Sequence, residues 1–153
     1  MYKALRETWD KMISAGEQFE ITEIEVRGET IKAYANAPPS LREVWQASAL
    51  FADRDYLVYQ DERWTYADAH RDVAAIAAWF GTQGIKSGDR VALALRNYPE
   101  WLLCYWAAVS QGITVVGMNA WWIGEEMRFA LEDSTPKLLI CDQERLDRFN
   151  EIR

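Results

Sequence analysis

The segment 101–124 carries no charged side chain, and it constrains the fold more than any other part of the chain. A segment of this length could form a membrane-spanning helix. Its interior argues against one, because Ser110, Gln111 and Gly112 interrupt the apolar run and β-branched residues follow at 113–116. Glycine ends helices and β-branched residues favour strands. The segment therefore predicts a buried helix, a stop at Gly112 and a buried strand, with no membrane span.

Short apolar strands alternate with helices throughout the C-terminal half. The expected strands are 89–96, 113–118 and 137–141, and the expected helices are 99–111, 125–132 and a last one from 142 onward. These strands have no polar face, which is typical of a parallel sheet covered by helices on both faces. The predicted fold class is therefore α/β, with a parallel sheet flanked by helices in the C-terminal half.

The N-terminal half predicts short antiparallel hairpins between helices. The expected elements are a helix at 4–14, strands at 19–26 and 30–35, a helix from 41, a hairpin at 56–66 with its turn at 61–62, and a helix ending near Phe80. Ser40 with Glu43 predicts a capping box, and Thr65 with Asp68 is a similar start. Pro38 and Pro39 break regular structure, so we expect two parts, 1–39 and 40–153.

Charge and cysteine content narrow the possible partners and the compartment. The 153 residues carry a net charge of −7, which argues against nucleic acid and anionic membranes as partners. The chain has two cysteines, Cys104 and Cys141, which fits free thiols in a reducing compartment. The first residues are too charged for a secretory signal. These features predict a cytoplasmic protein.

The residues alone predict no catalytic, cofactor-binding or metal-binding side chain. The glycines at 81, 84 and 88 lie between a helix end and a strand start, whereas a phosphate loop needs a strand followed by a helix. His70 is the single histidine and is expected on the helix after Thr65, at the surface or beside the apolar face, and the two cysteines lack zinc spacing.

Three polar residues follow the predicted parallel strands, where ligands bind in such sheets: Asn97, Asn119 and Asp142. Of these, Asn97 is better explained as the N-cap of the helix that follows it, with Glu100 completing a capping box.

The order of the motifs resembles the N-terminal part of adenylate-forming (AMP-binding) acyl-CoA synthetases. Among these, it is most similar to fatty-acid and medium-chain ligases. The residues that carry the resemblance, over about 19–150, are Trp64-Thr65-Tyr66-Ala67-Asp68, Gly84 to Ala92, Asn97-Tyr98-Pro99-Glu100-Trp101, Gln111 to Val116, Val116 to Asn119 and Asp133 to Asp142. Departures from the family pattern are Gly117 for a usual proline, Met118 and Ala69 for usual leucines, and Ile123-Gly124 where a Ser or Thr cap is usual.

The resemblance implies an enzyme that uses ATP, Mg²⁺ and CoA to activate a carboxylate as an acyl-adenylate. The family's phosphate loop, ribose-binding acid and C-terminal lysine have no counterpart in these 153 residues. The resemblance therefore implies an incomplete subdomain that is inert alone, whose partner is the remainder of the synthetase.

The predicted helix at 99–111 is apolar on too many sides to cover one sheet face only. We expect an exposed apolar surface there, with Trp101, Trp106, Trp121 and Trp122 as interface candidates, and self-association of the chain. The alternative is that these tryptophans are core residues.

Two other functions remain open at this point. The chain could be a stand-alone, non-catalytic interaction module related to these ligases. It could also be an unrelated small nucleotide-binding α/β protein, which would bind ATP tightly by itself.

Overall fold

The computed structural model describes residues 2–153. The chain divides into two compact units, Met1–Pro39 and Ser40–Arg153, and each is described by itself.

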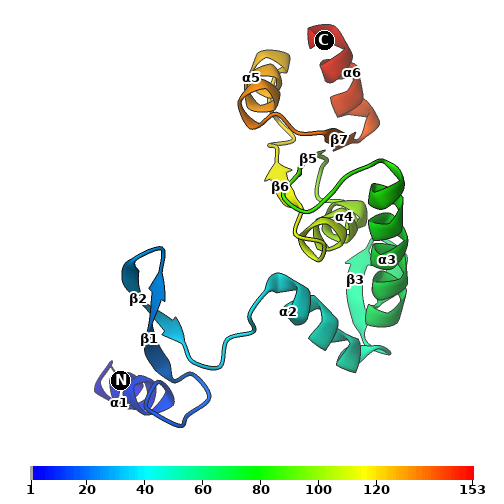
Figure 1. Ribbon diagram of the computed structural model, residues 1–153. Helices are drawn as coiled ribbons and strands as arrows, with labels where there is room; N and C mark the ends of the chain where they lie inside the picture. The colour runs from blue at the N-terminus through cyan, green and yellow to red at the C-terminus, as the bar shows by residue number, and fades with distance from the viewer. Residues whose placement is uncertain (1) are drawn as a thin grey trace. The chain divides into compact units, whose positions relative to one another are not determined.

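The first unit contains helix α1 (Tyr2–Met12) and a hairpin of strands β1 (Ile21–Val26) and β2 (Glu29–Tyr34) (Figure 1). Arg27 and Gly28 form the hairpin turn with φ of 54° and 86°, as a tight two-residue turn between twisted strands requires. Ile24 pairs directly with Ile31 across the hairpin, and both side chains are more than 40% exposed. The expected helix and strand pair are confirmed.

The second unit contains a hairpin, a parallel sheet and the helices around them. Its elements are α2 (Leu41–Ala47), a 3₁₀ turn η1 (Ser48–Phe51), β3 (Asp55–Tyr59), β4 (Glu62–Thr65), α3 (Tyr66–Thr82), β5 (Arg90–Ala94), α4 (Pro99–Val109), β6 (Thr114–Gly117), α5 (Gly124–Ser134), β7 (Leu138–Cys141) and α6 (Gln143–Ile152). Strands β3 and β4 pair antiparallel. The remaining three strands form a parallel sheet in the order β6-β5-β7, which confirms the predicted α/β class.

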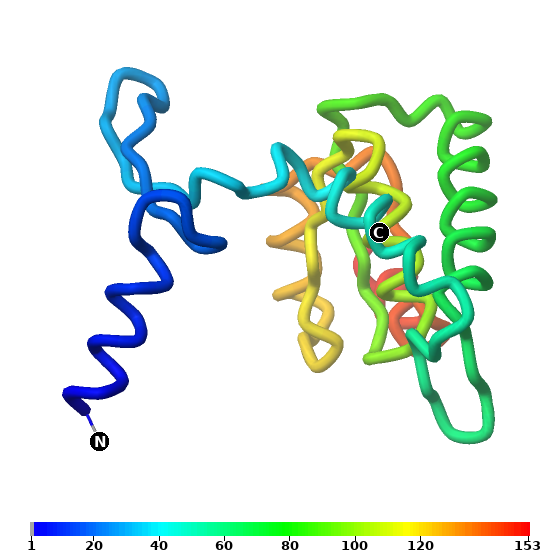
Figure 2. Tube along the Cα trace, turned by 90° about the horizontal axis from the view of Figure 1, so that it is seen from below, coloured from blue at the N-terminus to red at the C-terminus, as the bar shows by residue number. Residues whose placement is uncertain are grey.

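Strand β5 is the centre of the sheet, and its side chains alternate between two apolar clusters. Val91 and Leu93 lie in one cluster with residues of α3 and α4, including Phe80 and Leu103. Ala92, Ala94 and the residues of α5 and α6 form the other. In Figures 1 and 2, α3 and α4 accordingly lie on one side of the sheet and α5 and α6 on the other. The helices cover both faces, as the apolar strands predict.

The charge-free segment 101–124 is divided as expected between a helix and a strand. Helix α4 ends at Val109, Gly112 takes a φ of 72°, and β6 begins at Thr114. Among the residues that the structure describes, no helix has the length and apolarity needed to cross a membrane.

Two helix starts and one turn differ from the sequence prediction. The prediction of Asn97 as the cap of α4 is wrong, because the N-cap is Tyr98 and its side chain makes no capping hydrogen bond. Pro99 at the first helical position has no N–H group, so one fewer backbone donor needs a partner there. At α5, which lacks a Ser or Thr cap, the Ile123 N–H donates instead to Glu126 Oε2 at 2.9 Å. The β3–β4 turn lies at Gln60 and Asp61, one residue earlier than expected, because Tyr59 pairs with Glu62.

The packing of α3 on the sheet gives a paired stability test. Phe80→Ala removes a side chain with 0% exposure, and we expect it to lower the free energy of unfolding by about 3–5 kcal/mol. Trp79→Ala removes a neighbouring ring that is 44% exposed, and we expect a loss below about 1 kcal/mol. Urea unfolding followed by circular dichroism measures both, and equal losses would contradict the described orientation of α3.

Candidate functional site

The chain leaves β5 and its neighbour β7 toward opposite faces of the sheet. Helix α4 follows β5 and packs in the cluster that contains Leu93, whereas α6 follows β7 and packs in the cluster that contains Ala92. Where consecutive connections diverge in this way, the carboxyl edge of a parallel sheet opens into the crevice that commonly holds ligands. The carboxyl edge of β5 is therefore the candidate functional site.

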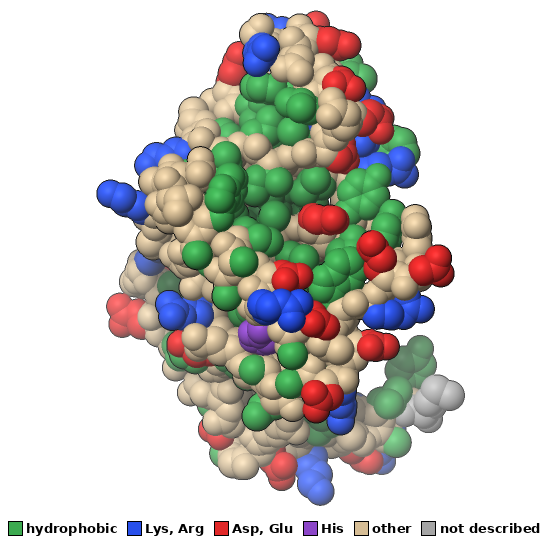
Figure 3. All heavy atoms as spheres, turned by 90° about the vertical axis from the view of Figure 1, so that its right-hand side faces the viewer, with side chains coloured by type: hydrophobic (Ala, Val, Ile, Leu, Met, Phe, Trp, Pro, Cys, Tyr) green, Lys and Arg blue, Asp and Glu red, His purple; other side chains and the backbone are tan. Residues whose placement is uncertain are grey.

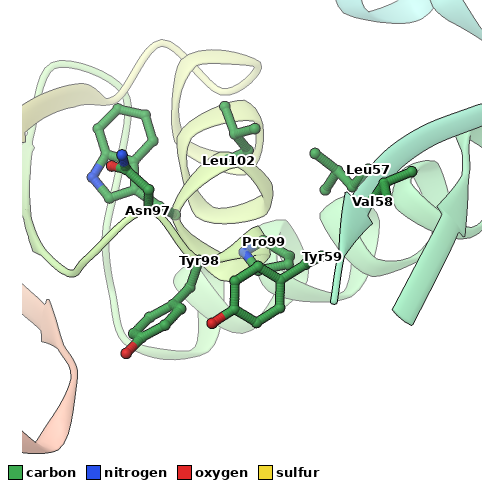
Figure 4. A pocket seen from close by; sticks show the side chains of 8 residues that line it. Leu57, Val58, Tyr59, Asn97, Tyr98, Pro99 and Leu102 are labelled. Atoms are coloured by element: carbon green, nitrogen blue, oxygen red, sulfur yellow. The ribbon is translucent and has the colours of Figure 1, made fainter. Parts of the chain in front are cut away.

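Three hollows meet at this edge, and all of them are lined by Tyr59 and Tyr98. The first, of about 410 Å³, is mainly apolar and lies between β3 and the start of α4; Figure 4 shows its lining, which is Leu57, Val58, Tyr59, Asn97, Tyr98, Pro99, Trp101 and Leu102. The second, of about 440 Å³, is more polar and reaches Arg96, Ala120 and Trp121. The third, of about 370 Å³, reaches Glu62, Glu100 and Asp142. The Tyr59 and Tyr98 rings stand edge to face, 5.8 Å apart.

Arg96 supplies the positive charge of the crevice. Its guanidinium lies 4.6 Å from the centre of the Trp121 ring, an attraction of about 0.5–1 kcal/mol at an exposed site. Within residues 2–153 this guanidinium forms no ion pair. The crevice therefore places an available cation beside an apolar hollow, which suits binding of an amphipathic anion.

Asp142 ties the end of β5 to the start of α6. Its carboxylate accepts hydrogen bonds from the backbone N–H groups of Arg96 at 3.2 Å and Arg145 at 3.1 Å. Partial burial raises the pKa of Asp142, but these hydrogen bonds and the Arg145 guanidinium outweigh it, so the pKa lies below its usual range. Asp142 is therefore the helix cap of α6 and a wall of the crevice.

Arg145 is buried and organises the loop after β6. Only 2% of its surface is exposed, and its guanidinium pairs with Asp142 at 3.2 Å and Glu144 at 2.8 Å while Nε donates to the Ala120 carbonyl at 2.8 Å. Arg148 donates to the Trp122 carbonyl at 2.8 Å. Helix α6 thus holds the backbone on both sides of Trp121.

The structure brings two of the three polar strand-end residues to the crevice. Asn97 lines two of the hollows, and Asp142 lines the third. Asn119 instead turns its own loop, because its Oδ1 accepts from the Trp121 N–H at 2.9 Å.

The four tryptophans named as interface candidates lie in different environments. Trp101 is half-buried and stacks on Tyr105, whereas Trp121 is 68% exposed. Trp106 stacks on Trp45 at 5.0 Å, and Trp122 packs in the α5–α6 cluster. Their role as an interface stays a prediction.

The surroundings of the histidine and the two cysteines indicate structural roles. His70 is half-buried, its ring stacks 4.1 Å from that of Trp45, and its Nε2 lies 3.0 Å from Ser48 Oγ. Burial lowers the pKa of His70 and raises that of Cys104 to about 11. Burial also raises the pKa of Cys141, so neither free thiol is a reactive thiolate at neutral pH.

Sequence reasoning missed Arg96, Tyr59 and Arg145. Arg96 lies two residues after the end of β5, so a charge near a strand's carboxyl end was an available signal. Tyr59 comes from the β3–β4 hairpin, and nothing local to it indicates where that hairpin packs.

The glycines between α3 and β5 do not have the placement of a phosphate loop. Gly81, Gly84 and Gly88 lie at the end of α3 and before β5, not between a strand and a following helix. Within residues 2–153 no group of three His, Cys, Asp or Glu side chains could hold a metal ion.

The carboxylate of Asp142 should make the free energy of unfolding depend on pH in the acidic range. Because its folded pKa lies below the unfolded one, its contribution is complete above the unfolded pKa of about 3.9 and is lost as the pH falls through the folded pKa. Urea unfolding between pH 2.5 and 6 measures this as a fall in the free energy of unfolding. In Asp142→Asn the fall should be shallower, and an unchanged slope would contradict the assignment.

Arg145 should be more important to stability than its neighbour Arg148. Arg145→Met removes a buried cation and strands its partners, so we expect a loss of about 3–5 kcal/mol in the free energy of unfolding. Arg148→Met, at a half-exposed position, should cost about 1–2 kcal/mol. Chemical unfolding of both variants checks the ranking, which an equal loss would overturn.

The family model described as AMP-binding enzyme matches residues 44–153. The crotonobetaine/carnitine–CoA ligase of Salmonella typhimurium is 31% identical over 120 residues, which cover 74% of this chain and 23% of that protein. The chain thus spans about a quarter of the length of the curated relatives that it matches.

Solved structures show the same fold. A Mycobacterium tuberculosis fatty acyl CoA synthetase superposes with a TM-score of 0.70 at 27% identity, over 74% of this chain and 23% of that one. An anthranilate CoA ligase in complex with anthranoyl-AMP has a TM-score of 0.73 at 21% identity, over 78% of this chain and 24% of that one. The expected resemblance is confirmed, and this chain belongs to the AMP-binding enzyme family.

Proposed function

We propose that this chain is the N-terminal part of an ATP-dependent acyl-CoA ligase. The complete enzyme would convert a carboxylate, ATP and CoA into acyl-CoA, AMP and pyrophosphate. The match of the AMP-binding enzyme model to residues 44–153 carries this proposal, and the ligases among the relatives support it. Because the chain spans 23% of such a relative, ATP, Mg²⁺ and CoA would be bound mainly by the remainder of the enzyme.

The proposed substrate is a fatty or medium-chain acid. A fatty acyl CoA synthetase is among the similar structures at 27% identity. An apolar hollow beside the Arg96 guanidinium is compatible with such an acid. We place the enzyme in the cytoplasm, where its two free cysteines would stay reduced.

The 153 residues by themselves are proposed to be inert. The crevice at the end of β5 offers a cation, an amide, two phenols and the carboxyl groups of Glu62, Glu100 and Asp142, but no serine, cysteine or histidine lines it. The same observation is compatible with the alternative, a related non-catalytic module that pairs with another chain.

Exposed apolar side chains are proposed to pack against the remainder of the synthetase. Trp101 and Trp121 line adjoining hollows, and Leu102 and Ile123 are exposed beside them in sequence. Where this surface stays uncovered, the chain would associate with itself.

ATP–pyrophosphate exchange with a panel of carboxylates tests this function. We expect no exchange above background for the 153-residue chain, because it contains no phosphate loop, and acid-dependent exchange for a longer product of the same gene. Octanoate and dodecanoate should be better substrates than acetate. Exchange by the 153-residue chain alone would refute its inertness, and no exchange by any longer product would favour the non-catalytic module.

A further inference from the structure

A hollow of about 270 Å³ lies among α2, α3 and the end of α4. It shares no lining residue with the three hollows of the crevice, and all its walls come from residues 42–111 of one compact unit. The side chains of Val73, Ala74 and Ala77 form an apolar wall on α3. His70 also lines the hollow, and in Figure 3 this single histidine, coloured purple, is visible on the molecular surface. A volume just below the roughly 300–1,000 Å³ of drug-sized sites suits a smaller molecule.

Besides its packing on Trp45, His70 offers one ring nitrogen as a hydrogen-bond acceptor. Ser48 Oγ lies 2.6 Å from the Trp45 carbonyl oxygen and 3.0 Å from His70 Nε2. A carbonyl oxygen only accepts, so it takes the single hydroxyl proton, and Ser48 Oγ must accept from Nε2–H. In the neutral ring, which the lowered pKa of His70 favours, Nδ1 is then the acceptor, and it forms no hydrogen bond within residues 2–153.

Ser110 has a buried hydroxyl group without a hydrogen-bond partner. Its Oγ forms no hydrogen bond among the described residues, although the residue lines the hollow. A buried hydroxyl group in this state is uncommon and destabilising. Rotation about the Cα–Cβ bond to another staggered position gives up no hydrogen bond, so the hydroxyl can turn toward a ligand at little cost.

Arg42 supplies a positive charge to the same hollow. It lies in the first turn of α2, is exposed, and forms no ion pair within residues 2–153. Among the described residues no aspartate or glutamate lines the hollow. Asp68 and Asp72, on either side of His70 along α3, both pair with Arg71. The charges around the hollow therefore favour an anion.

We propose that this hollow binds a small aromatic hydroxycarboxylate. The carboxylate pairs with Arg42, the hydroxyl group donates to Nδ1 of His70, and Ser110 gains a partner on an oxygen of the ligand. The ring packs on the α3 wall, where it loses fewer rotatable bonds on binding than a flexible chain would. This site is separate from the crevice, so it does not depend on the proposed ligase activity.

The single histidine is a selective reporter of this site, because its ring resonances monitor this hollow and not the crevice. Titration with 4-hydroxyphenylacetate at neutral pH, followed by proton NMR, should shift these resonances saturably with a Kd of about 1 mM, as expected for a small ligand at an open site. Phenylacetate, which cannot donate to Nδ1, should bind about fivefold more weakly. The uncharged amide 4-hydroxyphenylacetamide should bind about tenfold more weakly.

Three variants complete the test. Arg42→Gln should weaken binding about tenfold, and Ser110→Ala about threefold without lowering the free energy of unfolding, because it removes a hydroxyl group that has no partner. Arg96→Gln is the matched control, since it removes the cation of the crevice instead, and it should leave the Kd unchanged. Absence of a saturable shift, equal affinity for the amide, or an equal loss in Arg96→Gln and Arg42→Gln would overturn the proposal. None of these readouts depends on ligase activity.

Discussion

The burial of β5 on both faces and both edges is the constraint on which the second unit depends. Its alternating side chains differ in size, with Val91 and Leu93 on the α3–α4 side and Ala92 and Ala94 on the α5–α6 side. Small side chains let the second pair of helices approach the sheet closely, while the larger ones fill the space beneath α3 and α4. A strand fixed in this way holds its carboxyl end, and hence the crevice, in one place.

A charged network then connects that strand end to α6. The Asp142 carboxylate accepts a hydrogen bond from the backbone N–H of Arg96. The buried Arg145 guanidinium contacts both this carboxylate and the Ala120 carbonyl. The ends of β5 and β6 are thereby attached to one helix. Because a buried cation is costly unless every donor finds a partner, this network favours one arrangement of the loop that carries Trp121.

Most of the fold was predictable from residue patterns, because each pattern reflects local physics. Strands without a polar face predicted a covered parallel sheet, and Ser40 and Thr65 predicted helix starts that the structure confirms. Asn97 was mistaken for a cap because proline at the first helical position removes the need for one. The crevice was predictable only in part. Asn97 and Asp142 follow strands, but the contact of Tyr59 with Tyr98 depends on where a hairpin packs.

Strand β7 is apolar although it lies at one edge of the sheet. Apolar residues on both faces are typical of a strand that helices cover, and within the described residues only β5 pairs with it. The tryptophans show the same contrast, since Trp106 is covered by Trp45 whereas Trp121 remains 68% exposed. The proposed remainder of a ligase would bury such surfaces. A strand edge selects its partner by backbone geometry and an aromatic surface by shape, so the two surfaces need not share one partner.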